Sequence, residues 1–272
     1  MSEPTRTSRA PADKRLTYQQ WKRRKMLRLA RNWVLFLAGC AAVVALLTGG
    51  ILWLLPKVHV LLAGPKVFAA SVYDGTDYVF NAADARLTLV NANLPYTAEP
   101  APLLDTADEA TGQQLEAEAA MQYRSMAAAA QADGVSLTLV AGYQDADTRQ
   151  AAYEARVQTY RDKRKSAEAA RLAATIQPAA NANEHGTGYA ADILSADDPQ
   201  QDPGFAETRA YEWLTAYAAD YGFILRYPQD RQAASGIVFE PWHWRYVGVE
   251  NALAIRASGL SLEEFIALQR AD

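Results

Sequence analysis

The sequence predicts an α+β domain preceded by one transmembrane helix. Residues 33–55 contain no charged side chain, and about 20 apolar residues are enough for a helix to cross the hydrocarbon core of a bilayer. After this stretch, segments with the helical period of 3.6 and short segments with the strand period of 2 follow one another without regular strand–helix–strand alternation. Half of the 272 residues are apolar, which allows a sizeable core.

Charge is distributed unevenly along the chain. Residues 1–32 hold ten of the 27 Lys and Arg residues and two of the 31 Asp and Glu residues. The remainder therefore carries 17 bases and 29 acids, a formal charge of −12. An acidic body argues against nucleic acid as a partner. The single cysteine, Cys40, excludes an intrachain disulfide and a cysteine-based zinc site, and the oligomeric state stays open.

The uncharged stretch is predicted to be a signal-anchor helix over residues 33–55, with a tryptophan near each end where amphipathic rings favour the membrane interface. The basic residues before it predict a cytoplasmic tail, residues 1–32, and an extracytoplasmic location for everything after residue 56. They would also attract anionic lipids. Two alternatives remain: a cleaved signal peptide, whose apolar region is usually about 7–15 residues long, and a lipoprotein, because residues 37–40 resemble a lipobox.

Residues 56–86 are expected to form a stalk or small appendage in which His59 is structural or exposed. An Asp-Gly pair at residues 74–75 predicts a hairpin between residues 67–73 and 78–80. The remaining residues, 87–272, are predicted to form one domain. Apolar periodicity and glycine stops predict helices over about 109–132, 147–165, 166–176 and 210–221, a last helix after the capping box of Ser261 and Glu264, and strands over 87–91, 135–143, 223–227, 237–240 and 244–247.

Two short segments of this domain hold two of the three histidines. His185 and Asp192 flank two glycines, which permit the turn that brings a loop and the next strand to one site. Glu240 and His243 flank a proline, which disfavours helix at Glu240. Two imidazoles and one carboxylate make a three-ligand zinc set that leaves an open coordination position and a spare glutamate as base. Buried structural histidines are the alternative interpretation of each pair taken alone.

These residues carry a family resemblance. Residues 183–192, Asn-Glu-His-Gly-Thr-Gly-Tyr-Ala-Ala-Asp, resemble the Ser-x-His-x-x-Gly-x-Ala-x-Asp signature of VanY-type zinc D-alanyl-D-alanine carboxypeptidases. Residues 240–248, Glu-Pro-Trp-His-Trp-Arg-Tyr-Val-Gly, resemble the second motif of that family, in the right order and distance. Residues 222–228 and 259–264 are also similar to family segments. The likeness covers about Leu87 to the C-terminus.

The resemblance implies an α+β peptidase domain with zinc on His185, Asp192 and His243 and with Glu240 as the general base. Zinc would lower the pKa of its water and polarise the scissile carbonyl, and Glu240 would pass the water's proton to the leaving amine. The family's usual role implies hydrolysis of the C-terminal D-Ala bond of peptidoglycan stem peptides. Three alternatives remain: an L,D-carboxypeptidase, an endopeptidase of the same fold, and a non-catalytic cell-wall-binding domain.

The expected substrate-binding residues depart from the family pattern. The family commonly has Gly-Tyr-Arg-Ser with a Gln five residues after the Arg, whereas this chain has Gln144 and Arg149 at those two positions. We expect the two residues to have exchanged roles, the alternative being an exposed Arg149. Asn183 replaces the usual Ser and is expected to contact the substrate. Arg245 is expected either to add positive field for the substrate carboxylate or to form a structural ion pair.

Overall fold

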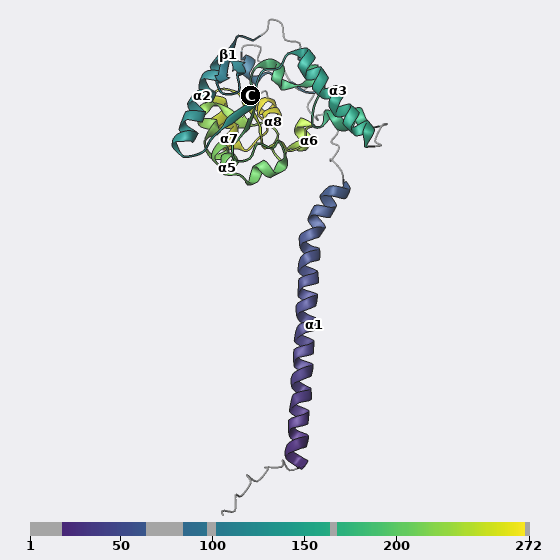
Figure 1. Ribbon diagram of the computed structural model, residues 1–272. Coiled ribbons are helices and arrows are strands. Elements are labelled where there is room, and N and C mark those ends of the chain that lie inside the picture. Colours follow the sequence, from purple (N-terminus) through teal and green to yellow (C-terminus); the bar gives the residue numbers. More distant parts are fainter. Residues whose placement is uncertain (1–17, 64–83, 97–101, 164–167, 270–272) are drawn as a thin grey trace, which may run out of the picture. The chain divides into compact units, whose positions relative to one another are not determined.

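The structure is a computed structural model that describes residues 18–63, 84–96, 102–163 and 168–269 (Figure 1). The chain divides into two compact units, Met1–Pro65 and Lys66–Asp272. The hairpin predicted around residues 74–75 and the first 17 residues of the basic tail lie outside the described residues.

The first unit contains one long helix, α1 (Tyr18–Ala63). It extends beyond residues 33–55 at both ends, because Lys, Arg and Gln in the flanking segments also have good helix propensity. Within the described part of the chain, Lys22–Leu46 is long and apolar enough to cross a membrane, a property that signal sequences near an N-terminus share. Large apolar side chains of this helix, Trp33 and Phe36 among them, are exposed.

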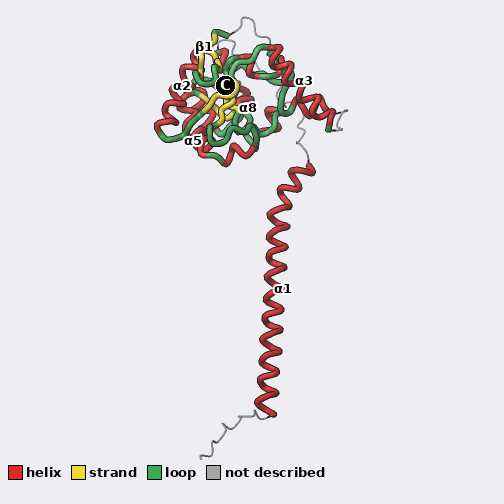
Figure 2. The backbone as a smooth tube through the Cα atoms, in the orientation of Figure 1, coloured by secondary structure: helices red, strands yellow, loops and turns green. Residues whose placement is uncertain are grey.

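The second unit confirms the predicted α+β class. A two-stranded antiparallel sheet joins β1 (Leu104–Asp108) to β2 (Gln113–Glu116). A four-stranded antiparallel sheet has the order β3-β4-β6-β5 and is formed by β3 (Thr138–Ala141), β4 (Ala190–Leu194), β6 (His243–Tyr246) and β5 (Phe223–Leu225). The strands are yellow in Figure 2.

Seven α-helices and five short 3-10 helices are described in the second unit. The α-helices are α2 (Ala117–Ala132), α3 (Ala146–Asp162), α4 (Ala169–Ala174), α5 (Arg209–Tyr217), α6 (Gln232–Ser235), α7 (Val249–Ser258) and α8 (Leu262–Gln269). The 3-10 helices are Ala85–Leu87, Ala180–Ala182, Glu184–Thr187, Pro203–Glu207 and Ala218–Tyr221.

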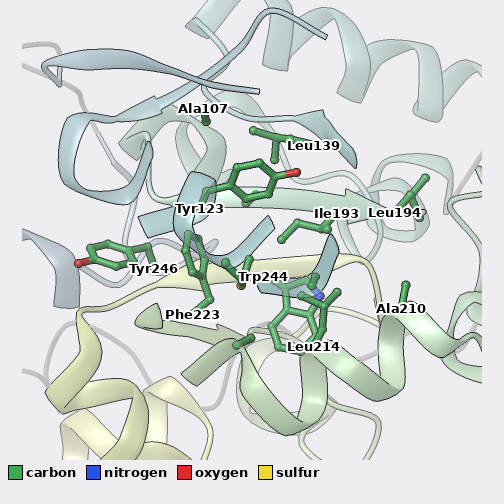
Figure 3. Packing of buried hydrophobic residues seen from close by; sticks show 14 of the residues in the cluster. Ala107, Tyr123, Leu139, Ile193, Leu194, Ala210, Leu214, Phe223, Trp244 and Tyr246 are labelled. Atoms are coloured by element: carbon green, nitrogen blue, oxygen red, sulfur yellow. The ribbon is translucent and has the colours of Figure 1, made fainter. Parts of the chain in front are cut away.

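The main core joins the four-stranded sheet to α2 and α5 (Figure 3). Tyr123 of α2 and Leu214 of α5 pack in one cluster with Ile193, Phe223 and Trp244 of the sheet. All five side chains are almost fully buried, and burying such a side chain contributes about 1.5–3 kcal/mol. This core holds β4 and β6, the two strands that carry the candidate ligands Asp192 and His243, at the centre of the sheet.

Several predicted elements agree with the structure. Helix α3 begins one residue before the predicted segment 147–165, and α4 lies inside the predicted segment 166–176. Strands β3 and β5 lie within their predicted strands. The capping box before α8 is confirmed: Ser261 N donates to Glu264 Oε2 at 2.8 Å, and Glu264 N donates to Ser261 Oγ at 3.2 Å.

Two predicted strands are wrong, and one predicted helix starts later than expected. The helix predicted from residue 109 begins only at Ala117, because residues 104–116 form the β1–β2 hairpin, with Gly112 in its turn at φ 69°. Residues 87–91 form no strand, since the side chain of Asn91 accepts from the backbone N–H groups of Asn93 and Leu94 and closes a turn there. Residues 237–240 also form no strand, and a turn at residues 241–242 connects them to β6.

Candidate metal centre

Antiparallel pairing of two central strands brings the predicted ligands together. Asp192 of β4 is the register partner of His243 of β6, although 50 residues separate them in the sequence. His185 lies in the 3-10 helix Glu184–Thr187, which leads into β4. One ligand atom from each of the three side chains lies within 4.8 Å of the others, and all three residues are buried. The structure therefore assembles the predicted set at one point.

The geometry of these atoms fits a shared cation. Asp192 Oδ1 lies 2.9 Å from Nδ1 of His243 and 3.4 Å from Nε2 of His185. Among the described residues, this buried Oδ1 has no partner with hydrogen-bond geometry, so the three atoms converge without bonding to one another. A metal ion would satisfy all three at once, and two imidazoles with one carboxylate are a ligand set typical of a zinc site with an open position.

Hydrogen bonds around the cluster orient two of these side chains. His185 Nδ1 lies 2.6 Å from the carbonyl oxygen of Gly142, an acceptor only, so Nδ1 carries the proton and the lone pair of Nε2 faces Asp192. Gln144 N donates in turn to His185 O at 3.1 Å. On the other side, Gln201 Nε2 donates to Asp192 Oδ2 at 3.0 Å, which leaves Oδ1 directed at the imidazoles.

Glu240 lies next to this cluster. Its Oε2 is 3.8 Å from Nδ1 of His243, and the side chain is buried. Burial raises the pKa of Glu240 to about 8, with the charge of His243 opposing the shift and that of Asp192 adding to it. A bound cation would lower this value. A carboxylate beside an open coordination position is suited to act as a general base.

Arg149 is buried, with 4 % of its surface exposed, which contradicts the alternative of an exposed side chain on α3. Its Nε donates to Asp145 O and its Nη1 to Asn183 O, both at 3.3 Å. The guanidinium packs against Gly186, where an added Cβ would meet Nη1 at 1.5 Å. Arg149 therefore lies against the same 3-10 segment that presents His185.

The other expected substrate contacts have a different character in the structure. Asn183 Oδ1 accepts from His185 N at 2.9 Å and caps the 3-10 helix, so this oxygen orients the ligand segment and is not free for a substrate. Gln144 Oε1 is buried and has no hydrogen-bond partner among the described residues.

For Arg245, the structure favours one of the two roles expected from the sequence. Its side chain is fully buried, lies 3.1 Å from Glu184 Oε1 and donates to the carbonyl oxygens of Arg86 and Thr88. These contacts match the structural ion pair and not the contribution to the substrate field. A buried guanidinium that donates hydrogen bonds to backbone carbonyl oxygens stabilises the fold.

Sequence reasoning missed several residues around the ligands, because charged side chains are usually exposed. Buried ion pairs join Arg226 to Glu184 and Glu263, and Glu184 in turn lies next to His243. Gln201 contacts Asp192 from a loop. Arg226 and Glu263 fall within the two flanking segments that resemble the family, 222–228 and 259–264, and this similarity was the one available signal.

Comparison with known proteins agrees with this geometry. Residues 112–249, just over half of the chain, match the family model described as "VanY: D-alanyl-D-alanine carboxypeptidase". The chain is 38% identical over 141 residues to a D-alanyl-D-alanine carboxypeptidase of Enterococcus faecalis, a match that covers 51% of this chain and 50% of that protein. The chain thus spans about half the length of the curated relatives it matches.

Two solved structures show the same fold. A Glu-to-Ala mutant of the vancomycin resistance D,D-pentapeptidase VanY from a VanB-type cassette, in complex with Zn(II), is 32% identical with a TM-score of 0.61, covering 67% of this chain and 99% of that chain. The LdcB LD-carboxypeptidase is 26% identical with a TM-score of 0.51, covering 71% and 78%. Sequence, fold and site geometry agree, and the chain belongs to the VanY D-alanyl-D-alanine carboxypeptidase family.

Proposed function

We propose that this protein is a membrane-anchored zinc carboxypeptidase that hydrolyses the C-terminal D-Ala peptide bond of peptidoglycan stem peptides. The observation that carries the proposal is the buried convergence of His185, Asp192 and His243 with Glu240 beside them. A cell-wall-binding module has no need of a general base next to a metal site. The D-alanyl-D-alanine carboxypeptidase of Enterococcus faecalis and the D,D-pentapeptidase VanY support the substrate class.

Each residue of the cluster has a defined role in this proposal. His185, Asp192 and His243 would hold the zinc ion, which supplies a Lewis acid for the scissile carbonyl and its attacking water. Glu240 accepts a proton from the attacking water and delivers it to the leaving amine of D-Ala. The positive charge of a bound cation would lower the raised pKa of the buried Glu240, so that the carboxyl group is ionised and can accept this proton.

Arg149 is proposed to take the role of the cationic residue that the family commonly has at the position of Gln144. It lies against Gly186, one residue from His185, and a guanidinium can bind a carboxylate or an oxyanion with two parallel hydrogen bonds. Gln144 offers only an uncharged amide. We therefore assign to Arg149 the stabilisation of negative charge on the substrate, and to Asn183 the orientation of the ligand segment.

Helix α1 is proposed to anchor the protein in the cell membrane through residues 33–55, with residues 1–32 cytoplasmic and the peptidase domain, residues 87–272, outside. The apolar run within α1 and its exposed large side chains support a lipid environment. The basic residues that precede this run support the orientation. Residues 56–86 would connect anchor and enzyme.

An L,D-carboxypeptidase that acts on the tetrapeptide stem is the second candidate, because the LdcB LD-carboxypeptidase has the same fold. The two activities differ in the residue that precedes the terminal D-Ala. The experiment incubates the full chain, in detergent and with zinc, with pentapeptide and tetrapeptide stems, and identifies the products by mass spectrometry. Glu240→Gln serves as the matched inactive control.

Release of D-Ala from the pentapeptide alone is the expected result. Release from the tetrapeptide alone would replace the proposal with the L,D activity. Zinc binding without release from either stem would favour an endopeptidase or a wall-binding domain. A chain that binds no zinc would contradict the proposal altogether.

A further inference from the structure

The metal-facing imidazole of His243 has a second nitrogen that points into the protein. Its Nδ1 lies 2.9 Å from Asp192 Oδ1, on the side of the candidate metal centre. Its Nε2 lies 3.7 Å from Glu184 Oε2, on the opposite side. Neither Nε2 nor this Oε2 has a hydrogen-bond partner among the described residues, and both are buried. A buried donor and a buried acceptor that lack other partners are complementary to each other.

Glu184 is held rigidly in this orientation by its other oxygen. Its Oε1 accepts from Nε of Arg226 at 2.8 Å and lies 3.1 Å from Nη1 of Arg245. The side chains of all three residues are completely buried. Two guanidinium groups on one carboxylate oxygen leave the second oxygen as the one directed at His243.

The surroundings keep Glu184 ionised despite its burial. Arg226 bonds through Nη1 and Nη2 to both carboxylate oxygens of Glu263 on α8, at 2.9 and 2.6 Å. The two arginines and the two glutamates therefore balance in formal charge. Glu184 therefore stays ionised, because protonating it would leave a buried guanidinium without a compensating negative charge.

We propose that Glu184 is a positioning residue for the metal centre: it accepts the Nε2 proton of His243 and so fixes the tautomer whose Nδ1 lone pair faces the metal. Metal-bound histidines usually donate their other ring N–H to a carboxylate or a carbonyl, and this bond fixes both tautomer and ring orientation. His185 is held by the carbonyl of Gly142, whereas His243 is held by a charged group. The inference rests on the proposed function, since it assumes that the cluster binds zinc.

The first measurement needs no variant. The chain contains three histidines, so selective ¹⁵N-histidine labelling of the full chain in detergent gives three imidazoles to assign by NMR, with His59→Ala removing the one outside the cluster. In the zinc-loaded protein, His243 is expected to show a metal-bound Nδ1 and a protonated Nε2. A metal-bound Nε2 on His243 would overturn the inference.

The second measurement compares two variants of the same buried network. Glu184→Gln keeps the shape of the side chain but loses the charge beside His243. Glu263→Gln removes the charge of the carboxylate that pairs with Arg226 in the same network. Both are expected to lower Tm, since each leaves excess buried positive charge. Only Glu184→Gln is expected to weaken zinc binding by about 10- to 100-fold, measured by chelator competition.

Equal zinc affinities in the two variants would show that Glu184 acts through folding alone and would overturn the inference. The proposed function fails differently. A wild-type chain that binds zinc with the expected tautomer but releases no D-Ala would contradict the enzymatic proposal and leave the positioning role in place. If Glu184→Gln does not fold, a metal-bound Nε2 on the wild-type His243 would still overturn the inference.

Discussion

The guanidinium of Arg149 and the backbone of Gly186 are in direct contact. A Cβ at position 186 would approach Nη1 of Arg149 to 1.5 Å and its Cζ to 2.4 Å, so only glycine leaves room for the arginine there. The contact places a buried cation one residue from the candidate ligand His185. It couples a residue of α3 to the 3-10 segment 184–187.

Replacing Arg149 with Ala is expected to lower kcat/KM for D-Ala release by about 10- to 150-fold, because hydrogen bonds to a charged group contribute about 1.5–3 kcal/mol. The matched control is Arg161→Ala, which removes the same charge from an exposed position of α3. Steady-state kinetics on a pentapeptide stem measure both variants. Normal turnover and substrate affinity in Arg149→Ala would refute the exchange of roles with Gln144.

Replacing Gly186 with Ala should imitate the loss of Arg149. Gly186 is not among the glycines with positive φ, so alanine is compatible with its backbone, and the three nearest atoms to the new methyl group all belong to Arg149. We expect kcat/KM to fall by a similar factor. In an Arg149→Ala background, Gly186→Ala should lower kcat/KM little further, because the guanidinium that its methyl group would meet is absent. Additive losses in this double-mutant cycle would argue against a shared cause.

Glu240→Gln is expected to lower kcat by about 10²- to 10⁴-fold, because the amide cannot accept the proton of the attacking water. The zinc content of the purified chain, determined by mass spectrometry of the metal, should stay near that of the wild type. Loss of zinc together with activity would make Glu240 a ligand and not the base.

The raised pKa of Glu240 also predicts that the stability of the zinc-depleted chain depends on pH. Its pKa is about 8 in the folded protein against a reference value of 4.5. Between these pH values the folded state retains a proton that the unfolded state has released. The free energy of unfolding of the wild-type chain therefore falls as the pH rises. Glu240→Gln cannot lose that proton. In chelator, the variant should therefore melt at a higher temperature than wild type at pH 8, and the difference should close towards pH 5. A difference that grows towards acid would contradict the assigned shift.

Zinc removal is expected to destabilise the second unit. Returning zinc at a thousandfold excess over its Kd should stabilise the folded state by about 4 kcal/mol, seen as a rise in Tm. His243→Ala should abolish this rise, and His59→Ala, which removes the third histidine of the chain, should not affect it. A zinc-dependent rise that survives His243→Ala would place the metal elsewhere.

Local sequence signals were sufficient where a few neighbouring residues determine the structure. The capping box of Ser261 and Glu264 acts within four residues and was predicted correctly. The β1–β2 hairpin was not, because its strands are largely polar and are stabilised by distant groups: Tyr143 N donates to Gln114 O, and Glu116 N donates to Gly188 O. Pairing of this kind leaves no periodic pattern in the strand itself.

The class of the fold, the family and the residue types at the candidate site can be predicted from the sequence, since spacing and chemistry identify a set of two imidazoles and a carboxylate. Which charged side chains are buried, and which groups they contact, became clear from the folded structure alone. Arg149, Arg226 and Arg245 look alike in the sequence, yet one lies beside the ligand segment and two neutralise Glu184. Burial and charge pairing depend on strands and helices that are distant in the chain, so no local pattern specifies them.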